Sequence, residues 1–139
     1  MAFGYNFFGN QPFRAEEANN NVSVAVQNWL NTLCTHNVDA IVSLYAPDGI
    51  LLGTVAKEIA EGQAAIRKYF EMFVQKKPCG KITSMTVQNF GNVKVVDGTY
   101  TFELHDGKKK SIVDARYTFV FQYRRGRWLI MTHHSSKQP

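Results

Sequence analysis

The sequence closes on two adjacent histidines, His133 and His134, at the end of an apolar run. A histidine can act as a general acid or base near neutral pH, or bind a metal through a ring nitrogen. Neighbours on a strand point to opposite faces, so the two rings cannot easily hold one ion. A metal site would need His36 or His105, and no HxH, HExxH or CxxC spacing supports one. We expect no metal, one histidine in an internal pocket, and the other at a subunit contact or the strand end.

Two carboxylates are further candidates for acid–base chemistry. Asp48 in APDG could be a general base, although Asp before Gly is also ordinary turn chemistry. Glu103 or a strand-end histidine could serve as the single tuned acid or base that an isomerase, cyclase or hydratase needs in an apolar pocket. No nucleophile elbow, phosphate loop or dinucleotide-binding glycine motif occurs, so no cofactor is expected.

Arg116 lies within DARYTFVFQY, a segment with the composition of a strand. A charged residue in the middle of a half-buried strand needs a partner. Two interpretations stay open. Arg116 forms a structural pair with Asp114 or Glu103, or its guanidinium binds the carboxylate of a small ligand.

Composition excludes several classes of partner. The formal charge is +5 and the pI about 9.3, and GKKKS is the only lysine cluster, so the basic stripe of a nucleic-acid-binding protein is missing. No apolar stretch approaches the roughly 20 residues of a membrane span. The N-terminus shows no secretory leader. Cys34 and Cys79 stand in unrelated contexts, so we expect no disulfide framework and a reducing, cytoplasmic location.

The elements that must position these residues come in two blocks, helices first and strands afterwards. A helix near 22–33, a short helix capped by Asn37 and ended by APDG (46–49), and a helix over 62–74 have apolar residues at helical spacing. Their predicted inner faces hold Val22, Val26, Trp29, Leu30, Leu33, Ile41, Leu44, Tyr45, Ala65, Ile66, Tyr69, Phe70 and Phe73. ILLG and KEIAEG read as short extended pieces.

Strand-like segments follow near 82–90, 92–96, 99–105, 111–123 and 127–135. Turns are predicted at 97–98, 105–110 and 124–126, where Asp-Gly, HDGKKK and RRG occur. Helices followed by antiparallel strands predict an α+β fold with the helices on one face of a curved sheet. In the strand over 111–123, alternation places Arg116 and Val120 on one face and Phe119 on the other. In the strand over 127–135, it places Ile130 and His134 on one face and Met131 and His133 on the other. Both faces then carry large apolar groups, which predicts a homo-oligomer.

Residues 1–14 have no helical or strand period, although five of them are aromatic. We expect a flexible N-terminal tail over 1–14 and a single domain over 15–139. The alternative is an arm whose aromatic residues contact a partner subunit.

Four motifs together resemble one family: Y-x-x-D-G after the second helix, E-G-x-x-x-I-x-x-Y-F, A-R-Y-T-F-V and G-R-W-L-I-x-x-H-H-S-S. Over roughly 18–137 the chain resembles the association (hub) domain of calcium/calmodulin-dependent protein kinase II, and still more its stand-alone bacterial relatives. This family belongs to the nuclear transport factor 2-like, SnoaL-like superfamily. The resemblance implies a cystatin-like α+β cone with a pocket at its wide end, which assembles through the outer face of its sheet into dimers or rings of dimers.

The resemblance does not transfer an activity. Kinase hub domains carry arginines deep in the pocket, and the matching positions here hold Phe119 and Ser135, while Arg67 does match a family arginine. The residues expected to bind a small, partly apolar and possibly carboxylate-bearing ligand are Tyr45, Arg67, Tyr69, Phe70, Phe73, Arg116, Tyr117, Phe119, His133 and His134. Three functions remain: a ligand-binding association domain, a cofactor-independent isomerase, cyclase or hydratase, and a pure assembly module.

Overall fold

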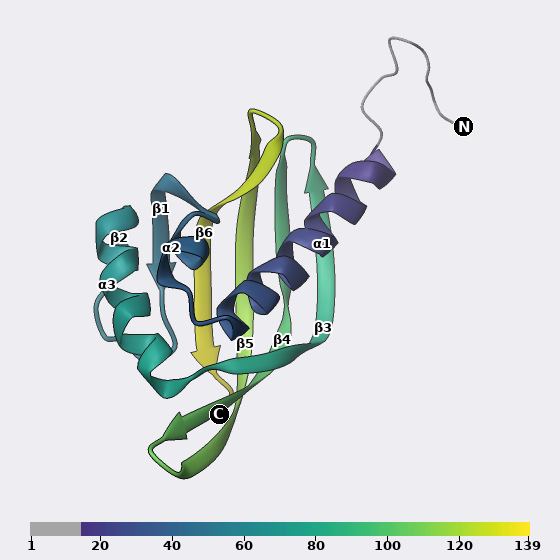
Figure 1. Cartoon of the computed structure of the whole chain (residues 1–139). Coiled ribbons are helices and arrows are strands. Elements are labelled where there is room, and N and C mark those ends of the chain that lie inside the picture. The colour runs from purple at the N-terminus through teal and green to yellow at the C-terminus, as the bar shows by residue number, and fades with distance from the viewer. Residues whose placement is uncertain (1–14) are drawn as a thin grey trace.

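The computed structural model describes the backbone of residues 15–139, and side chains from residue 22 onward. Helices lie on one face of a six-stranded sheet (Figure 1). The helices are α1 (Ala15–Cys34), α2 (Val38–Val42) and α3 (Gln63–Phe73), with a 3₁₀ turn at Val74–Lys76. The strands are β1 (Tyr45–Leu52), β2 (Ala60–Glu61), β3 (Cys79–Phe90), β4 (Val93–Asp106), β5 (Lys109–Arg124) and β6 (Arg127–Lys137). The predicted tail over 1–14 lies outside the described residues.

The helices form where the apolar spacing predicts them. The inner face of α1 is buried at 0–2% exposure, and its members are Val22, Val26, Trp29, Leu30 and Leu33. Asn37 caps α2, since its side-chain oxygen accepts a hydrogen bond from the Ala40 N–H at 3.1 Å. Tyr45, predicted on this helix, instead begins β1. The helix α3 buries Ile66, Tyr69, Phe70 and Phe73 against the same core.

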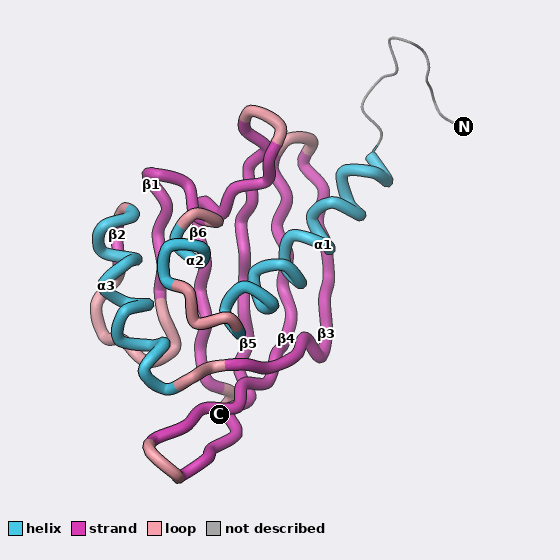
Figure 2. Tube along the Cα trace, in the orientation of Figure 1, coloured by secondary structure: helices cyan, strands magenta, loops and turns pink. Residues whose placement is uncertain are grey.

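The strand order is β2-β1-β6-β5-β4-β3 (Figure 2). Strand β1 runs parallel to β6, and every other neighbouring pair is antiparallel. The predicted turn at 97–98 is wrong, because Asp97-Gly98 lies inside β4, which continues without a break to Asp106. The APDG segment, predicted to end the short helix, follows that helix and belongs to β1. A Cβ on Gly98 would lie 2.1 Å from the Ser84 carbonyl oxygen, so close packing explains this glycine. The turn before β4 instead uses Gly91, at φ 76°.

The two faces of the sheet differ more than the sequence predicts. In β5, Tyr117, Phe119 and Phe121 are buried under the helices, while Arg116 is exposed on the outer face. In β6, the pairing with β5 shifts between Ile130 and Thr132. This bulge turns Ile130 and His133 to the same, inner face, so the strict alternation predicted for β6 is wrong. The large rings therefore lie inside, and the outer face is mostly polar.

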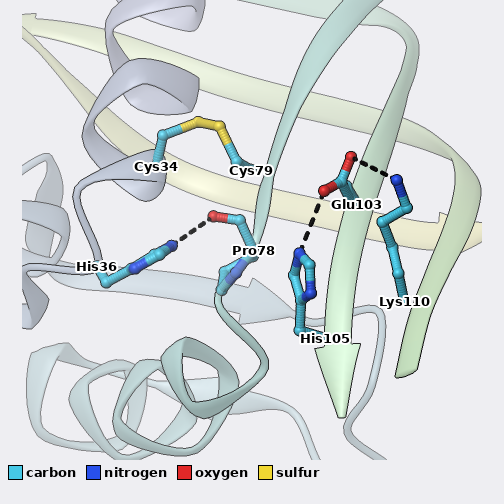
Figure 3. A network of polar contacts seen from close by, with 7 residues as sticks. All are labelled: Cys34, His36, Pro78, Cys79, Glu103, His105 and Lys110. Carbon is cyan, nitrogen blue, oxygen red and sulfur yellow. Dashed lines mark hydrogen bonds and ion pairs between the residues drawn. A yellow bond between two sulfur atoms is a disulfide. The ribbon is translucent and has the colours of Figure 1, made fainter. Parts of the chain in front are cut away.

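The two cysteines form a disulfide, which corrects the expectation of unpaired thiols. Cys34 at the end of α1 is bonded to Cys79 at the start of β3, across 45 residues of sequence (Figure 3). Beside it, the His36 ring donates a hydrogen bond to the Pro78 carbonyl oxygen at 3.0 Å. The disulfide and this hydrogen bond tie the helical layer to the edge strand of the sheet. Within the described chain, no helix is long and apolar enough to span a membrane.

Candidate functional site

A small cavity lies between the helices and the concave face of the sheet. Helix α1 contributes Trp29, α3 contributes three rings, and the ends of β1 and β6 close the remaining side. Its lining residues are Trp29, Leu51, Gly53, Thr54, Tyr69, Phe70, Phe73, Tyr100, Phe102, His133 and Ser135. The cavity volume is about 10 Å³. That is room for about one water molecule, so aromatic side chains nearly fill the cone.

His133 is the polar centre of this interior, at 1% exposure. Its ring stacks on Phe119 with centroids 3.9 Å apart, and the edge of Trp29 meets it at 4.9 Å. Both ring nitrogens have partners. Tyr45 Oη lies 2.8 Å from Nδ1 and Tyr100 Oη lies 3.1 Å from Nε2.

These hydrogen bonds have one consistent direction. The Trp29 indole N–H can only donate, and its acceptor is Tyr45 Oη at 3.1 Å. The Tyr45 hydroxyl then donates to Nδ1 of His133, because buried hydroxyl protons need an acceptor. His133 consequently carries its proton on Nε2 and donates to Tyr100, which also hydrogen-bonds Ser135. Ser135 Oγ in turn contacts Thr54 Oγ1. The chain of polar groups crosses the cone from α1 to the mouth.

The buried titratable side chains in this hydrogen-bonded series are uncharged. Burial, together with the nearby His134, lowers the pKa of His133 to about 3. Burial likewise raises the pKa of Tyr45 and of Tyr100 far above the ordinary tyrosine range. Within the part of the chain whose side chains are described, no Asp, Glu, Lys or Arg lines the cavity. The interior can therefore hydrogen-bond an uncharged polar group, but it offers a carboxylate no counter-charge.

The mouth of the cavity is closed by Tyr69 and the segment that follows β1. Burial raises the pKa of the Tyr69 hydroxyl to about 12, although the nearby polar groups of Val55 and Thr54 act in the opposite direction. A Cβ on Gly53 would lie 2.2 Å from Tyr69 Cε2, so only glycine permits this approach.

Several predicted residues do lie in or around the cavity. Tyr69, Phe70, Phe73 and His133 line it. Tyr45, Tyr117 and Phe119 are buried in the surrounding core, and Tyr45 and Phe119 contact His133 directly.

Arg116 and His134 are exposed on the outer face, away from the cavity. Arg116 pairs in register with Thr99 and Ser136, and among described residues its guanidinium has no ion pair. Its predicted partner Asp114 instead accepts a hydrogen bond from Thr101 at 2.8 Å. The structure therefore corrects both interpretations of Arg116, as a carboxylate-binding residue inside the cone and as a member of a structural ion pair, because strand alternation turns its side chain outward.

The remaining candidates are surface groups. Glu103 contacts His105 at 3.1 Å and Lys110 at 3.9 Å on the outer face (Figure 3). Asp48 lies 3.3 Å from Arg124, and hydrogen bonding to that guanidinium lowers its pKa. Arg67 pairs with Asp39 at 2.6 Å. None of these three lines the cavity, which removes Asp48 and Glu103 as bases within it.

Sequence reasoning missed part of the lining. Trp29 was predicted as core only, and Tyr100, Phe102, Gly53 and Thr54 were not singled out. The apolar alternation of TYTFEL could have indicated Tyr100 and Phe102 as inward residues. No local signal indicates Gly53 and Thr54, because their role comes from contacts with α3 and β6. Among the described residues, no group of three or more His, Cys, Asp or Glu could hold a metal ion.

Comparison with known proteins identifies the family. The family model for the calcium/calmodulin dependent protein kinase II association domain matches residues 18–139. A structure from Xanthomonas campestris, described as a candidate member of that family, is 45% identical, with a TM-score of 0.83 over 92% of this chain and 90% of that chain. Among curated proteins, none matches.

More distant structures share the fold alone. A candidate dehydratase of the nuclear transport factor 2-like family from Streptomyces avermitilis is 12% identical, with a TM-score of 0.82 over 89% of this chain and 99% of that chain. A candidate scytalone dehydratase from Novosphingobium aromaticivorans is 10% identical, with a TM-score of 0.80 over 89% and 86% of the two chains. Further neighbours are described as cystatin-like, so the α+β cone predicted from the sequence is confirmed.

Proposed function

Because the chain belongs to the calcium/calmodulin dependent protein kinase II association domain family, we propose that it is a homo-oligomeric domain that assembles through the outer face of its sheet. The match over residues 18–139 carries this proposal. A homodimer or a ring of dimers is the expected product, with no nucleic acid or membrane as partner.

The character of the outer face supports self-association. Val95, Val120 and Thr132 lie in register across three strands and are each half-buried. Around them the face is mostly polar, and it includes Arg116, which forms no ion pair with any described residue. A small apolar centre with a polar surround is the usual composition of an interface between folded subunits.

Light scattering tests assembly directly, since the chain mass is 15.8 kDa. We expect a multiple of that mass at micromolar concentration. Val120→Glu should shift the mass toward the monomer, because it places a charge at the centre of the proposed interface. Met72→Glu on the exposed side of α3 is the matched control and should leave the mass unchanged. A wild-type mass of 15.8 kDa would reject the proposal.

A second function, binding of a small molecule inside the cone, is favoured by the ordered polar chain through His133. The partly apolar pocket is closed here, so binding requires it to widen. Isomerase, cyclase or hydratase chemistry has weaker support. Among the described residues that line the cavity, His133 is the only buried titratable base, and its low pKa of about 3 makes it a poor proton acceptor near neutral pH.

The cytoplasmic location stays a prediction. The disulfide between Cys34 and Cys79 weighs against it, because disulfides persist mainly in oxidising compartments.

A further inference from the structure

We propose that segment 53–59 is a gate over the cone, and that the gated site takes a small aromatic carboxylate whose ring lies inside and whose carboxylate stays at the mouth. The proposal rests on the small-molecule function proposed above and names its ligand class and its control. It does not depend on self-association.

Two chambers meet at the gate. Outside it lies a surface hollow of about 250 Å³ between segment 53–59 and the end of β6. Gly53, Thr54 and Ser135 line both the hollow and the inner cavity. The hydrogen bond between Thr54 Oγ1 and Ser135 Oγ therefore stands between the chambers. The inner cavity, at about 10 Å³, is too small for an aromatic ring, so a ring can enter from the outer hollow only when the gate between the two chambers opens.

Tyr69 is the latch that holds the gate shut. Its ring and hydroxyl pack against Gly53, where an added Cβ would lie 2.2 Å from Cε2 and 2.8 Å from the hydroxyl oxygen, and the hydroxyl lies beside the polar groups of Val55 and Thr54. The latch comes from α3, whose Phe70 and Phe73 are fixed in the core. The gate can thus move while the helix that holds it stays in place.

The segment itself has little that anchors it elsewhere. It contains no helix or strand between Leu52 and Ala60, and one backbone hydrogen bond, from Ala56 to Gly53 at 3.3 Å, lies within it. Val55 and Ile59 are 39% and 55% exposed. Since opening removes few buried apolar contacts, local opening should cost far less than global unfolding.

The lining of each chamber selects a different part of the ligand. The inner chamber has aromatic faces and the neutral polar groups of Tyr100, His133 and Ser135, which suit a ring with an uncharged hydroxyl. The outer hollow is lined by Lys57 and Lys137 against the single acidic residue Glu58. Its excess positive charge favours a carboxylate left at the mouth.

Trp29 provides a reporter for the inner chamber, because it lines that cavity and the chain has one other tryptophan, Trp128. In a Trp128→Phe background, Trp29 fluorescence is followed during titration with three probes at pH 7.5. The probes are 4-hydroxybenzoate, phenol and 4-hydroxybenzylamine, which share a ring and differ in charge. We expect the apparent Kd to be lowest for the carboxylate and highest for the amine.

Tyr69→Phe and Thr54→Val test the gate. Each removes hydroxyl contacts of the closed form, so the apparent Kd for 4-hydroxybenzoate should fall by about 2- to 10-fold as the open fraction rises. Hydrogen exchange of the amides in 53–59 should speed up in both variants, with the amides of β4 unchanged. Lys57→Gln and Lys137→Gln should each raise the apparent Kd for 4-hydroxybenzoate and leave that for phenol unchanged. Lys108→Gln at the β4–β5 turn serves as the matched control and should change neither Kd.

Each part of the proposal can fail by itself. If the hydrogen-exchange rates of the amides in 53–59 are unchanged in both Tyr69→Phe and Thr54→Val, the gate is rejected. Binding of a probe with wild-type affinity would in that case still support the small-molecule function. An amine that binds as well as the carboxylate overturns the ligand class. No Trp29 response to any probe in the latch variants overturns the site and the small-molecule function together. Light scattering on the same samples reports self-association independently of these results.

Discussion

His133 shows how a single side chain depends on its surroundings. Its two nitrogens are both hydrogen-bonded to tyrosines, and its ring lies flat on Phe119. Protonation would turn Nδ1 from an acceptor into a donor and place a charge where no counter-charge exists. The residue therefore acts as a neutral connector between α1, β1 and β4, and this role has consequences for stability.

We expect His133 to make the protein acid-sensitive. The folded pKa is about 3 and the reference value is 6.5, so below pH 6.5 the unfolded chain binds the extra proton. This contribution to stability is complete above about pH 6.5 and is lost progressively as the pH falls toward 3. Between pH 7.5 and 5 the loss should be about 2 kcal/mol of unfolding free energy. Urea unfolding of wild type and His133→Gln across this range measures it.

His134→Gln is the control for this experiment, because His134 lies outside on the exposed face. The stability difference between wild type and His133→Gln should shrink as the pH falls, whereas His134→Gln should keep most of the wild-type slope, because burial is the larger cause of the low His133 pKa. Parallel pH profiles for wild type and His133→Gln would show that His133 titrates normally.

A second prediction at this scale concerns the exposed side chain of Arg116. It is exposed and has no ion pair among the described residues, so Arg116→Ala should change the unfolding free energy by less than about 0.5 kcal/mol in the isolated subunit. In an assembly through the outer face, the same change should raise the dissociation constant, as removal of an interfacial arginine usually does. Sedimentation over a concentration series, with Lys108→Ala as control, measures this. A large stability loss with unchanged assembly would return Arg116 to a structural role.

At the scale of elements, the structure depends on how the helical layer is fixed to the sheet. The core provides most of the contact, through the buried faces of α1 and α3. The disulfide adds a covalent link at the point where α1 ends and β3 begins (Figure 3). Glycines at close approaches have a comparable role, since Gly98 allows β4 to pass Ser84 and Tyr117 without a side chain between them.

Reduction of the disulfide should destabilise the fold. A closed loop of 45 residues corresponds to about 4 kcal/mol in the chain-entropy description. Denaturant unfolding with and without a dithiol reductant should show a loss of this order. The Cys34→Ser, Cys79→Ser double variant should match the reduced protein and be insensitive to the reductant. Titration of two free thiols in protein purified without reductant would contradict the pairing itself.

At the scale of the whole molecule, a cone filled by its own aromatic side chains presents one long polar sheet face outward. Function then divides between that face, for self-association, and the mouth of the cone, for a ligand. The proposed interface lies on the outer face of β4 to β6, whereas the mouth is formed by segment 53–59 and the end of β6. Strand β6 is therefore the element that the two regions share.

Residues 1–14, which lie outside the described residues, should be dispensable for folding. Among the described side chains, the first core residue is Val22 on α1, and the family match begins at residue 18. A chain that starts at residue 15 should keep the wild-type melting temperature within about 2 °C, since it loses no residue of the family match. Limited proteolysis of the full chain should leave a core that starts near residue 15. If the shortened chain folds but changes its mass in solution, the aromatic segment is an intersubunit arm.

Local patterns in the sequence determined the elements and the fold class. Helical spacing placed α1 and α3, Asn37 marked the cap of α2, and the motifs ending in HHSS identified the family. These signals are local, because each depends on a few residues within one or two turns or one strand. Alternation also separated the rings of His133 and His134 correctly.

Tertiary structure alone decided which candidates share a site. The bulge at Met131 set the inner face of β6, and the disulfide joined cysteines whose sequence contexts gave no hint of contact. Arg116, Glu103 and Asp48 resembled site residues by type, yet strand direction turned them to the surface. The cavity is bounded by residues from five separate elements and a loop, and its closure depends on Tyr69 reaching Gly53. Such contacts between distant segments leave no period in the sequence, because they are fixed only when the layers pack.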